Sequence, residues 1–308
     1  MRFPNVRTLT KPIDMKTNFA YFLPAFLFFS LANLFVSCSS EDSDSGEPML
    51  IVKFQFDPDQ QRLNNLGQVS AIPDGHAAQS PDFHKISAHY FELSPDMYTQ
   101  LGEGAVLYRA PETTQGGENA IDFSKARIVS EDETFIKIPL RKIASGNYNW
   151  VRVSLSYQNY GIRFLQSGTE YDGTLASFLG FRTFIDSHSI GNNFFDINGN
   201  RSQGYWAFAL DDYPFSSEGQ SDRTTVPNPL ASTSPVPAGS CVVTGKFLKE
   251  FQITGNETKD VVVTLSLSTN NSFEWADINP DGKFEPSAGE NVVDMGIRGL
   301  VPSFSVQE

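Results

Sequence analysis

Apolar and polar residues alternate along most of the chain beyond residue 48. Every second position is Leu, Val or Phe in residues 49–56 (MLIVKFQF), and residues 148–157 (YNWVRVSLSY) repeat the pattern. Side chains of a β-strand point alternately to the two faces of its sheet, so this alternation predicts half-buried strands. In the second run we expect Val151, Val153, Leu155 and Tyr157 to form the buried face. Trp150, Arg152, Ser154 and Ser156 form the opposite face.

Shorter alternating segments follow one another with Gly, Pro, Asn and Asp between them. No segment keeps apolar residues at helical spacing for more than a turn or two. Many short strands separated by turn residues predict an all-β fold, an antiparallel β-sandwich of Greek-key or jelly-roll type. The further strands are expected at residues 83–93, 105–108, 134–140, 161–165, 176–185, 204–210, 241–247 and 260–268.

We expect residues 49–308 to form a single domain. Residues 57–82 are polar and predict a long loop. Residues 214–239 are rich in Ser and Pro, a composition that is also typical of a linker between two domains. We favour a surface connection within one domain, because neither flank contains a complete set of strands.

The N-terminus has the pattern of a secretory signal. Residues 19–36 are nearly all apolar (FAYFLPAFLFFSLANLFV), Lys16 precedes them, and Ser37-Cys38 follows. This order predicts a signal peptide over residues 1–37, in which residues 1–14 are an extension from a mis-assigned start and Met15 is the true one. A retained membrane helix is the alternative, but the stretch is short for that role and contains Pro24.

Residues 35–38 (FVSC) resemble a bacterial lipobox, in which Cys38 receives a diacylglycerol and an acyl chain such as palmitate. Residues 38–48 then form an acidic, polar tether that we expect to be disordered. Its acidic tract resembles the one that follows the lipidated cysteine in many Bacteroidota lipoproteins, which implies the outer membrane and its cell-surface leaflet. A plain solvated linker is the alternative for this tract.

Charge and cysteine content exclude several classes of function. The net charge is −13, and the predicted removal of residues 1–37 makes it more negative. Nucleic-acid binding depends on neutralising phosphates with Lys and Arg, so it is disfavoured. Besides Cys38 the chain has only Cys241, which rules out a disulfide within the domain and a multi-cysteine zinc site. Cys241 opens an apolar run (CVVTGKF) and is predicted to be a small buried residue.

One segment carries a specific chemical pattern. Residues 277–284 (DINPDGKF) place side-chain oxygens at alternate positions, followed by a glycine that permits a sharp turn. This spacing predicts a structural calcium loop. The predicted ligands are Asp277, Asn279, Asp281, the carbonyl of Lys283, and Glu290. The loop lacks the Glu expected at its twelfth position, and an Asx-rich turn without a metal is the alternative.

Two other sets of residues are weaker candidates. His76, His84 and His89 offer an alternative transition-metal site for copper or zinc, although His84 and His89 are five residues apart and point to opposite faces of one strand. Tyr160 and Trp206 are candidates for stacking on a sugar ring, with a place in an aromatic core as the alternative. We find no nucleophile, metal-protease or phosphate-loop motif, so no catalytic residue is predicted and an enzyme is disfavoured.

Four blocks carry a resemblance: residues 83–94 (FHKISAHYFELS), 146–160 (GNYNWVRVSLSYQNY), 204–210 (GYWAFAL) and 292–302 (VVDMGIRGLVP). Together with the lipobox they resemble a Bacteroidota-type surface or periplasmic lipoprotein with a β-sandwich domain. The order of strands is also similar to the periplasmic copper-binding proteins of methanobactin operons, which implies metal handling. The leading expectation is a lipid-anchored, non-catalytic envelope protein that binds a ligand or protein partner, with metal handling and glycan binding as alternatives.

Overall fold

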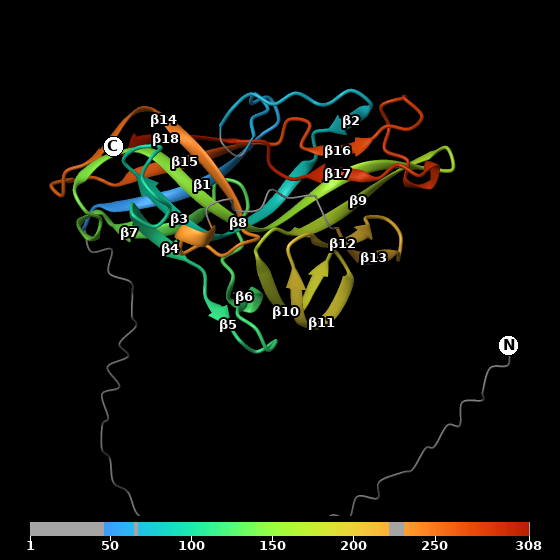
Figure 1. Cartoon of the computed structure of the whole chain (residues 1–308), viewed down its shortest axis with the longest axis horizontal. Helices are drawn as coiled ribbons and strands as arrows, with labels where there is room; N and C mark the ends of the chain where they lie inside the picture. The colour runs from blue at the N-terminus through green and yellow to red at the C-terminus, as the bar shows by residue number, and fades with distance from the viewer. Residues whose placement is uncertain (1–45, 65–66, 222–230, 308) are drawn as a thin grey trace, which may run out of the picture. The chain divides into compact units, whose positions relative to one another are not determined.

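The computed structural model describes residues 46–64, 67–221 and 231–307, so the predicted signal peptide, Cys38 and most of the tether lie outside the described residues. The strands in this part of the chain are labelled in Figure 1. They are β1 (Met49–Asp57), β2 (His76–Gln79), β3 (Asp82–Ser94), β4 (Ala105–Arg109), β5 (Glu112–Thr113), β6 (Ala120–Asp122), β7 (Thr134–Pro139), β8 (Gly146–Gln166), β9 (Thr169–Phe178), β10 (Arg182–Ile190), β11 (Asn193–Ser202), β12 (Tyr205–Leu210), β13 (Ser216–Gln220), β14 (Cys241–Ile253), β15 (Val261–Ser268), β16 (Phe273–Ala276), β17 (Val292–Met295) and β18 (Leu300–Val306).

The largest sheet has seven strands, and β8 is its central member. Its order is β13-β12-β9-β8-β3-β4, and β14 also pairs with β8. Strand β8 is 21 residues long and pairs with β14 along its first half, with β3 along its middle and with β9 along its second half. One long strand therefore belongs to two regions of the molecule and connects them.

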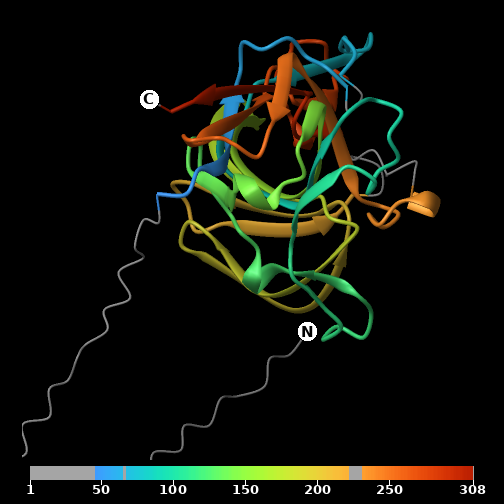
Figure 2. The same cartoon turned by 90° about the vertical axis from the view of Figure 1, so that its left-hand side faces the viewer.

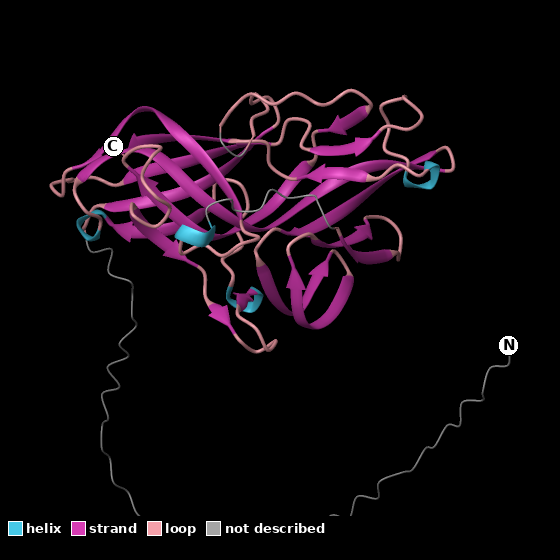
Figure 3. Ribbon diagram, viewed as in Figure 1, coloured by secondary structure: helices cyan, strands magenta, loops and turns pink. Residues whose placement is uncertain are grey.

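Smaller sheets pack against both faces of this sheet. A four-stranded sheet (β18-β15-β1-β7) lies on one side, and the hairpin of β10 and β11, extended by β6 and β5, lies on the other. Figure 2 shows β1 and β18 above the green strand β8, and the yellow hairpin below it. Within the described residues the helical segments are all short 3-10 turns (Figure 3). The predicted all-β sandwich is confirmed.

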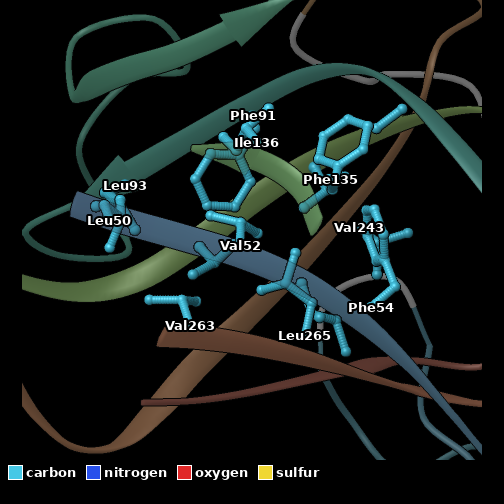
Figure 4. Close-up of a cluster of buried hydrophobic side chains, with 14 of the residues drawn as sticks. Leu50, Val52, Phe54, Phe91, Leu93, Phe135, Ile136, Val243, Val263 and Leu265 are labelled. Carbon is cyan, nitrogen blue, oxygen red and sulfur yellow. The ribbon is translucent and has the colours of Figure 1, made fainter. Parts of the chain in front are cut away.

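The main core lies between the four-stranded sheet and the first half of β8. Leu50, Val52 and Phe54 of β1 are fully buried there, beside Val263 and Leu265 of β15 (Figure 4). Burial of each such side chain stabilises the fold by roughly 1.5–3 kcal/mol relative to exposure. Strands β1 and β15 run parallel, although most of the pairs in the fold are antiparallel. The alternation of residues 49–56 thus predicted the buried face correctly.

At Ser156 the side chains of β8 exchange the faces of the sheet to which odd-numbered and even-numbered residues point. Ser87 and Ala88 are consecutive on β3, but they pair with Tyr157 and Leu155 on β8, so Ser156 is an extra residue on β8. Such a bulge shifts the alternation by one residue. Val151, Val153 and Leu155 face the main core as expected, whereas Tyr157 packs on the opposite side. The prediction that Tyr157 shares their face is therefore wrong.

The second half of β8 faces a three-stranded sheet, β17-β16-β2. Tyr160 and Ile162 of β8 pack there against Phe273 and Trp275 of β16 and against Met295 of β17. In Figure 1 these strands lie above β9 at the right, while β12 and β13 continue the large sheet below. Trp206 and Phe208 of β12 border the same cluster of side chains.

Several predicted boundaries need correction. Residues 161–165 are the second half of β8, and residues 176–185 contain the end of β9 and the start of β10. The predicted loop 57–82 contains β2, and the predicted Ser/Pro-rich connection 214–239 contains β13. Both strands lack strong apolar alternation, and each is held by backbone pairing to a partner strand, β16 or β12. Gly46–Glu308 forms one compact unit.

Candidate ligand-binding cleft

Strand β12 (YWAFAL) is apolar on both of its faces. Tyr205, Ala207 and Ala209 are buried against the β10–β11 hairpin, whereas Trp206, Phe208 and Leu210 are only half-buried on the other face. An antiparallel strand with one solvated face usually carries polar residues on that face. The half-buried aromatic face of β12 is therefore a candidate binding surface.

Glycines on the neighbouring strands leave room for the two aromatic rings. A Cβ atom on Gly219 of β13 would lie 2.5 Å from Cζ2 of Trp206, and a Cβ atom on Gly173 of β9 would lie 2.3 Å from Cζ of Phe208. Each ring therefore extends sideways over a glycine of the adjacent strand. Both rings consequently lie against the sheet, and the space above them stays open.

That space is a cavity of about 490 Å³. Phe164 of β8 and Phe215 line it together with Trp206 and Phe208, and the opposite wall includes Phe273 of β16 and Phe284. Small-molecule sites in proteins have this size and this mainly apolar lining, with a few polar groups. The polar residues that line the cavity are Gln166, Ser217, Gln220, Ser221, Glu290 and Asn291.

The polar groups of this cleft are mostly uncharged. Glu290 is the ionisable residue among its lining residues, and it is only 3% exposed. Its two carboxylate oxygens accept hydrogen bonds from the N–H groups of Ile278 (3.2 Å) and Glu285 (2.6 Å). No Lys, Arg or His is among the described residues that line the cavity, so an anionic ligand would find no counter-charge there, and the one carboxylate is already bonded to backbone amides; the cleft therefore favours an uncharged ligand.

A second cavity of about 650 Å³ lies on the other side of Phe164 and Phe284, which line both. Four of its charged residues form two ion pairs at the surface. The Arg163 guanidinium lies 3.0 Å from the Asp172 carboxylate, and the Lys283 ammonium lies 3.2 Å from that of Glu170. Because these pairs are exposed, each contributes little to stability. This cavity presents a polar rim and no aromatic face comparable to that of β12.

The predicted calcium loop is folded by its own carboxylates. Asp277 Oδ2 accepts a hydrogen bond from the Gly282 N–H (3.3 Å), and Asp281 Oδ1 accepts one from the Lys283 N–H (2.9 Å). Asp277 Oδ1 is buried and has no hydrogen-bond partner among the described residues. Asn279 is exposed, whereas Glu290 is occupied by backbone amides at the base of the loop. Asp277 Oδ1 is thus a buried oxygen without a hydrogen-bond partner among the described residues, whereas both carboxylate oxygens of Glu290 are bonded to backbone amides.

Each predicted histidine ligand has its own partner in the structure. His76 Nδ1 lies 2.6 Å from Glu274 Oε1, His89 Nε2 lies 2.8 Å from Glu112 Oε1, and His84 Nδ1 lies 3.2 Å from Asn159 Oδ1. Within residues 46–64, 67–221 and 231–307, no three His, Cys, Asp or Glu side chains are grouped so that they could hold a metal ion. The three histidines are not brought together.

The hydrogen bond from His89 has an electrostatic consequence for its partner. It lowers the pKa of Glu112 and outweighs the opposing effect of burial. His89 itself is 1% exposed and contacts the tilted ring of Phe181, with 5.4 Å between ring centroids. This arrangement is typical of a structural hydrogen bond, which here joins β3 to β5.

The two predicted stacking residues have different environments. Tyr160 is fully buried and stacks against Phe83 with 4.8 Å between ring centroids, so its predicted contact with a ligand is wrong. Trp206 lines the cleft, as a ligand-stacking residue must. Cys241 is partly buried beside the main core, and burial together with the nearby Asp294 carboxylate raises the pKa of its thiol to about 12. That thiol is therefore a packing residue and a poor nucleophile.

Sequence reasoning missed Phe164, Phe208 and Phe215. The sequence contained a signal for Phe208, because residues 205–210 carry aromatic side chains at both odd and even positions. A strand with one solvated face usually carries polar residues on that face. Phe164 lies on β8 opposite Tyr171 of β9, and Phe215 lies in the turn between β12 and β13, so neither is marked by the alternation of its own segment as a residue of the cleft.

Among the described residues no helix is long and apolar enough to cross a membrane. No protein-family model, no curated protein and no solved structure matches the chain significantly.

Proposed function

We propose that the protein is a lipid-anchored, non-catalytic binding protein of the bacterial cell envelope, and that it takes an uncharged amphipathic ligand into the cleft over β12. The observation that carries this proposal is the half-buried aromatic face of Trp206 and Phe208 in a cavity of about 490 Å³. The envelope location is supported by the sequence of residues 19–38, through the signal peptide and Cys38. Outer-membrane anchoring at the cell surface is part of the same proposal.

The cleft is tested with Nile red, an uncharged dye whose fluorescence rises in apolar surroundings. The protein is the chain from Cys38 onward, produced without lipid. We expect saturable dye binding that Trp206→Ala and Phe215→Ser each weaken. Phe215 is 53% exposed, so its replacement should leave the fold intact. Tyr98→Ala is the matched control, because Tyr98 is 84% exposed and does not line the cleft. Equal dye binding by all four proteins would refute the proposed site.

We further propose that the loop after β16 binds a structural calcium ion. Asp277, Asn279, Asp281 and the Lys283 carbonyl supply the oxygens, and Glu290 holds the loop closed through the N–H groups of Ile278 and Glu285. The observation that favours calcium is the buried, unpartnered Oδ1 of Asp277, since an isolated buried carboxylate oxygen is costly. Oxygen ligands of this kind suit a hard cation.

Calcium should raise the thermal stability of the same chain relative to a sample with chelator. At a calcium concentration of about 100 times Kd, the expected gain is about 2.7 kcal/mol. Asp281→Ala should abolish the gain, whereas Asp212→Ala, which removes an exposed carboxylate outside the loop, should keep it. A calcium effect that survives Asp281→Ala, or no effect in the unmodified protein, would mean that the loop is an Asx-rich turn.

A further inference from the structure

A continuous row of aromatic rings extends from the cleft across the surface of the large sheet. Phe208 contacts Phe164 with 5.7 Å between ring centroids, and Phe164 contacts Tyr171 at 5.8 Å. Tyr171 in turn contacts Tyr213 at 5.8 Å. Trp206 begins the row, because it lies two residues before Phe208 on the same face of β12. The row thus links three strands and the turn after β12.

The rings at the far end of the row are open to solvent. Tyr213 is 56% exposed, and Phe215 beside it is 53% exposed. Large exposed aromatic residues that form a contiguous surface are typical of binding sites. A row of rings on an open surface suits an extended ligand with repeated units, whereas a compact ligand needs only the cleft. An acyl chain would be expected in an enclosed apolar channel, and the exposed hydroxyl-bearing end of this row does not provide one.

Four of the charged residues near the row form two ion pairs. Arg163 pairs with Asp172, and Lys283 pairs with Glu170. The whole chain carries a net charge of −13, which repels anionic chains such as nucleic acids and acidic polysaccharides. Asp211 and Asp212, exposed directly before Tyr213, add further negative charge, so an anionic extended ligand is disfavoured on this surface.

Amide and hydroxyl groups border the rings. The side-chain amide nitrogen of Gln220 donates to the carbonyl of Gln203 (2.7 Å), and that of Asn291 donates to the carbonyl of Gly289 (3.2 Å). Each of these side chains keeps its amide oxygen as an acceptor for a ligand hydroxyl. Gln166 and Ser217 add further polar groups to the lining. A ligand with many hydroxyls fits this border.

We infer that the ligand is an unbranched neutral oligosaccharide that lies along the row from Trp206 to Tyr213. This inference rests on the proposed function, since it names the ligand class of the same cleft. The C–H faces of successive sugar rings lie on the aromatic rings, and sugar hydroxyls bond to the amides and hydroxyls of the border. Such a ligand combines an apolar face with polar edges, as Tyr and Trp side chains themselves do. The cleft holds one end of the sugar chain, and Tyr171 and Tyr213 hold units beyond it.

The test is calorimetric titration of the chain from Cys38 onward with neutral hexasaccharides of glucose, xylose and mannose, with the corresponding disaccharides, and with hexagalacturonate. We expect at least one neutral hexasaccharide to bind, more tightly than its disaccharide, and hexagalacturonate to bind no better. Tyr213→Ala should weaken the hexasaccharide about threefold to tenfold, the range expected for one aromatic contact. The same substitution should leave disaccharide and Nile red binding unchanged, and Tyr98→Ala should change nothing.

The outcomes separate this inference from the proposed function. If Nile red binds in a Trp206-dependent way but no neutral sugar binds, the ligand class is wrong and the binding cleft stands. If neither binds, both proposals fail. Preferential binding of hexagalacturonate would overturn the charge argument. An equal affinity for hexasaccharide and disaccharide would overturn the extended row.

Discussion

His188 is a buried histidine among aromatic rings. It stacks against Phe195 with 4.8 Å between ring centroids and contacts Phe178 and Tyr205, and neither of its ring nitrogens has a hydrogen-bond partner among the described residues. Burial lowers its pKa from 6.5 to about 4. The unfolded chain therefore takes up a proton at this residue below pH 6.5, while the folded protein does so only near pH 4. The buried neutral His188 therefore contributes to the free energy of unfolding above pH 6.5, and this contribution is lost as the pH falls from 6.5 toward 4.

His188→Phe should remove this loss. A pKa lowered from 6.5 to about 4 corresponds to roughly 3 kcal/mol in the free energy of unfolding between neutral pH and pH 4. We expect the variant to be at least as stable as the original at pH 7.5 and increasingly more stable than it at pH 5.5 and 4.0, as measured by urea unfolding. His84→Gln, at a partly exposed histidine, is the control. A stability difference that does not vary with pH would show that His188 does not cause the effect.

Alternation alone assigned the residues of β8 correctly up to Leu155. It failed from Tyr157 onward, because the extra residue at Ser156 arises from how β8 pairs with β3, and the pattern within one strand does not contain that register. The same shift explains Tyr160, which turns into the core and not toward a ligand. Trp206 was predicted as an aromatic candidate, but the wall that faces it comes from Phe273 and Phe284, which the pattern within β12 does not indicate.

At the scale of elements, the β12–β13 pair determines whether the cleft is open. Gly219→Ala places a methyl group 2.5 Å from the Trp206 ring, so the ring has to move into the cleft. We expect a loss of about 1–3 kcal/mol in stability, weaker Nile red binding and a shifted tryptophan emission spectrum. Ser216→Ala, at an exposed residue of β13 that does not line the cleft, should change none of these strongly. Unchanged emission and dye binding in Gly219→Ala would show that Trp206 does not depend on the glycine.

Strands with clear alternation, such as β1, β3, β12 and β15, were predicted close to their observed bounds. Strand β13 (SSEGQ) was missed because its residues have little strand preference, and backbone pairing with β12 makes it a strand. The parallel pairing of β1 with β15 joins segments that are far apart in the sequence, and alternation carries no information about partners. The cleft depends on such pairings, so alternation pointed to Trp206 but not to the residues that join it in the cleft.

At the scale of the whole molecule, Glu274 connects distant parts of the chain. Its carboxylate accepts hydrogen bonds from Arg62 and from Arg298 (3.2 Å) and lies 2.6 Å from His76 Nδ1, while Arg298 also pairs with Asp294. Burial works to raise the pKa of Glu274, but the hydrogen bonds from His76 and Arg62 outweigh it and lower that pKa. The network ties the loop after β1, strands β2, β16 and β17, and the segment before β18 together.

Glu274→Gln should therefore be strongly destabilising, because it leaves the buried guanidinium of Arg62 without its counter-charge. Breaking a buried pair in this way costs about 3–5 kcal/mol. Glu170→Gln is the matched control, since Glu170 pairs with Lys283 but both side chains are about half exposed, and the expected cost is below about 1 kcal/mol. Urea unfolding at pH 7 measures both. A large difference would mean that the three-stranded sheet, and with it one wall of the cleft, is held in place by buried charge. Two equally small effects would mean that the apolar contacts of Phe273 and Trp275 suffice to hold that wall.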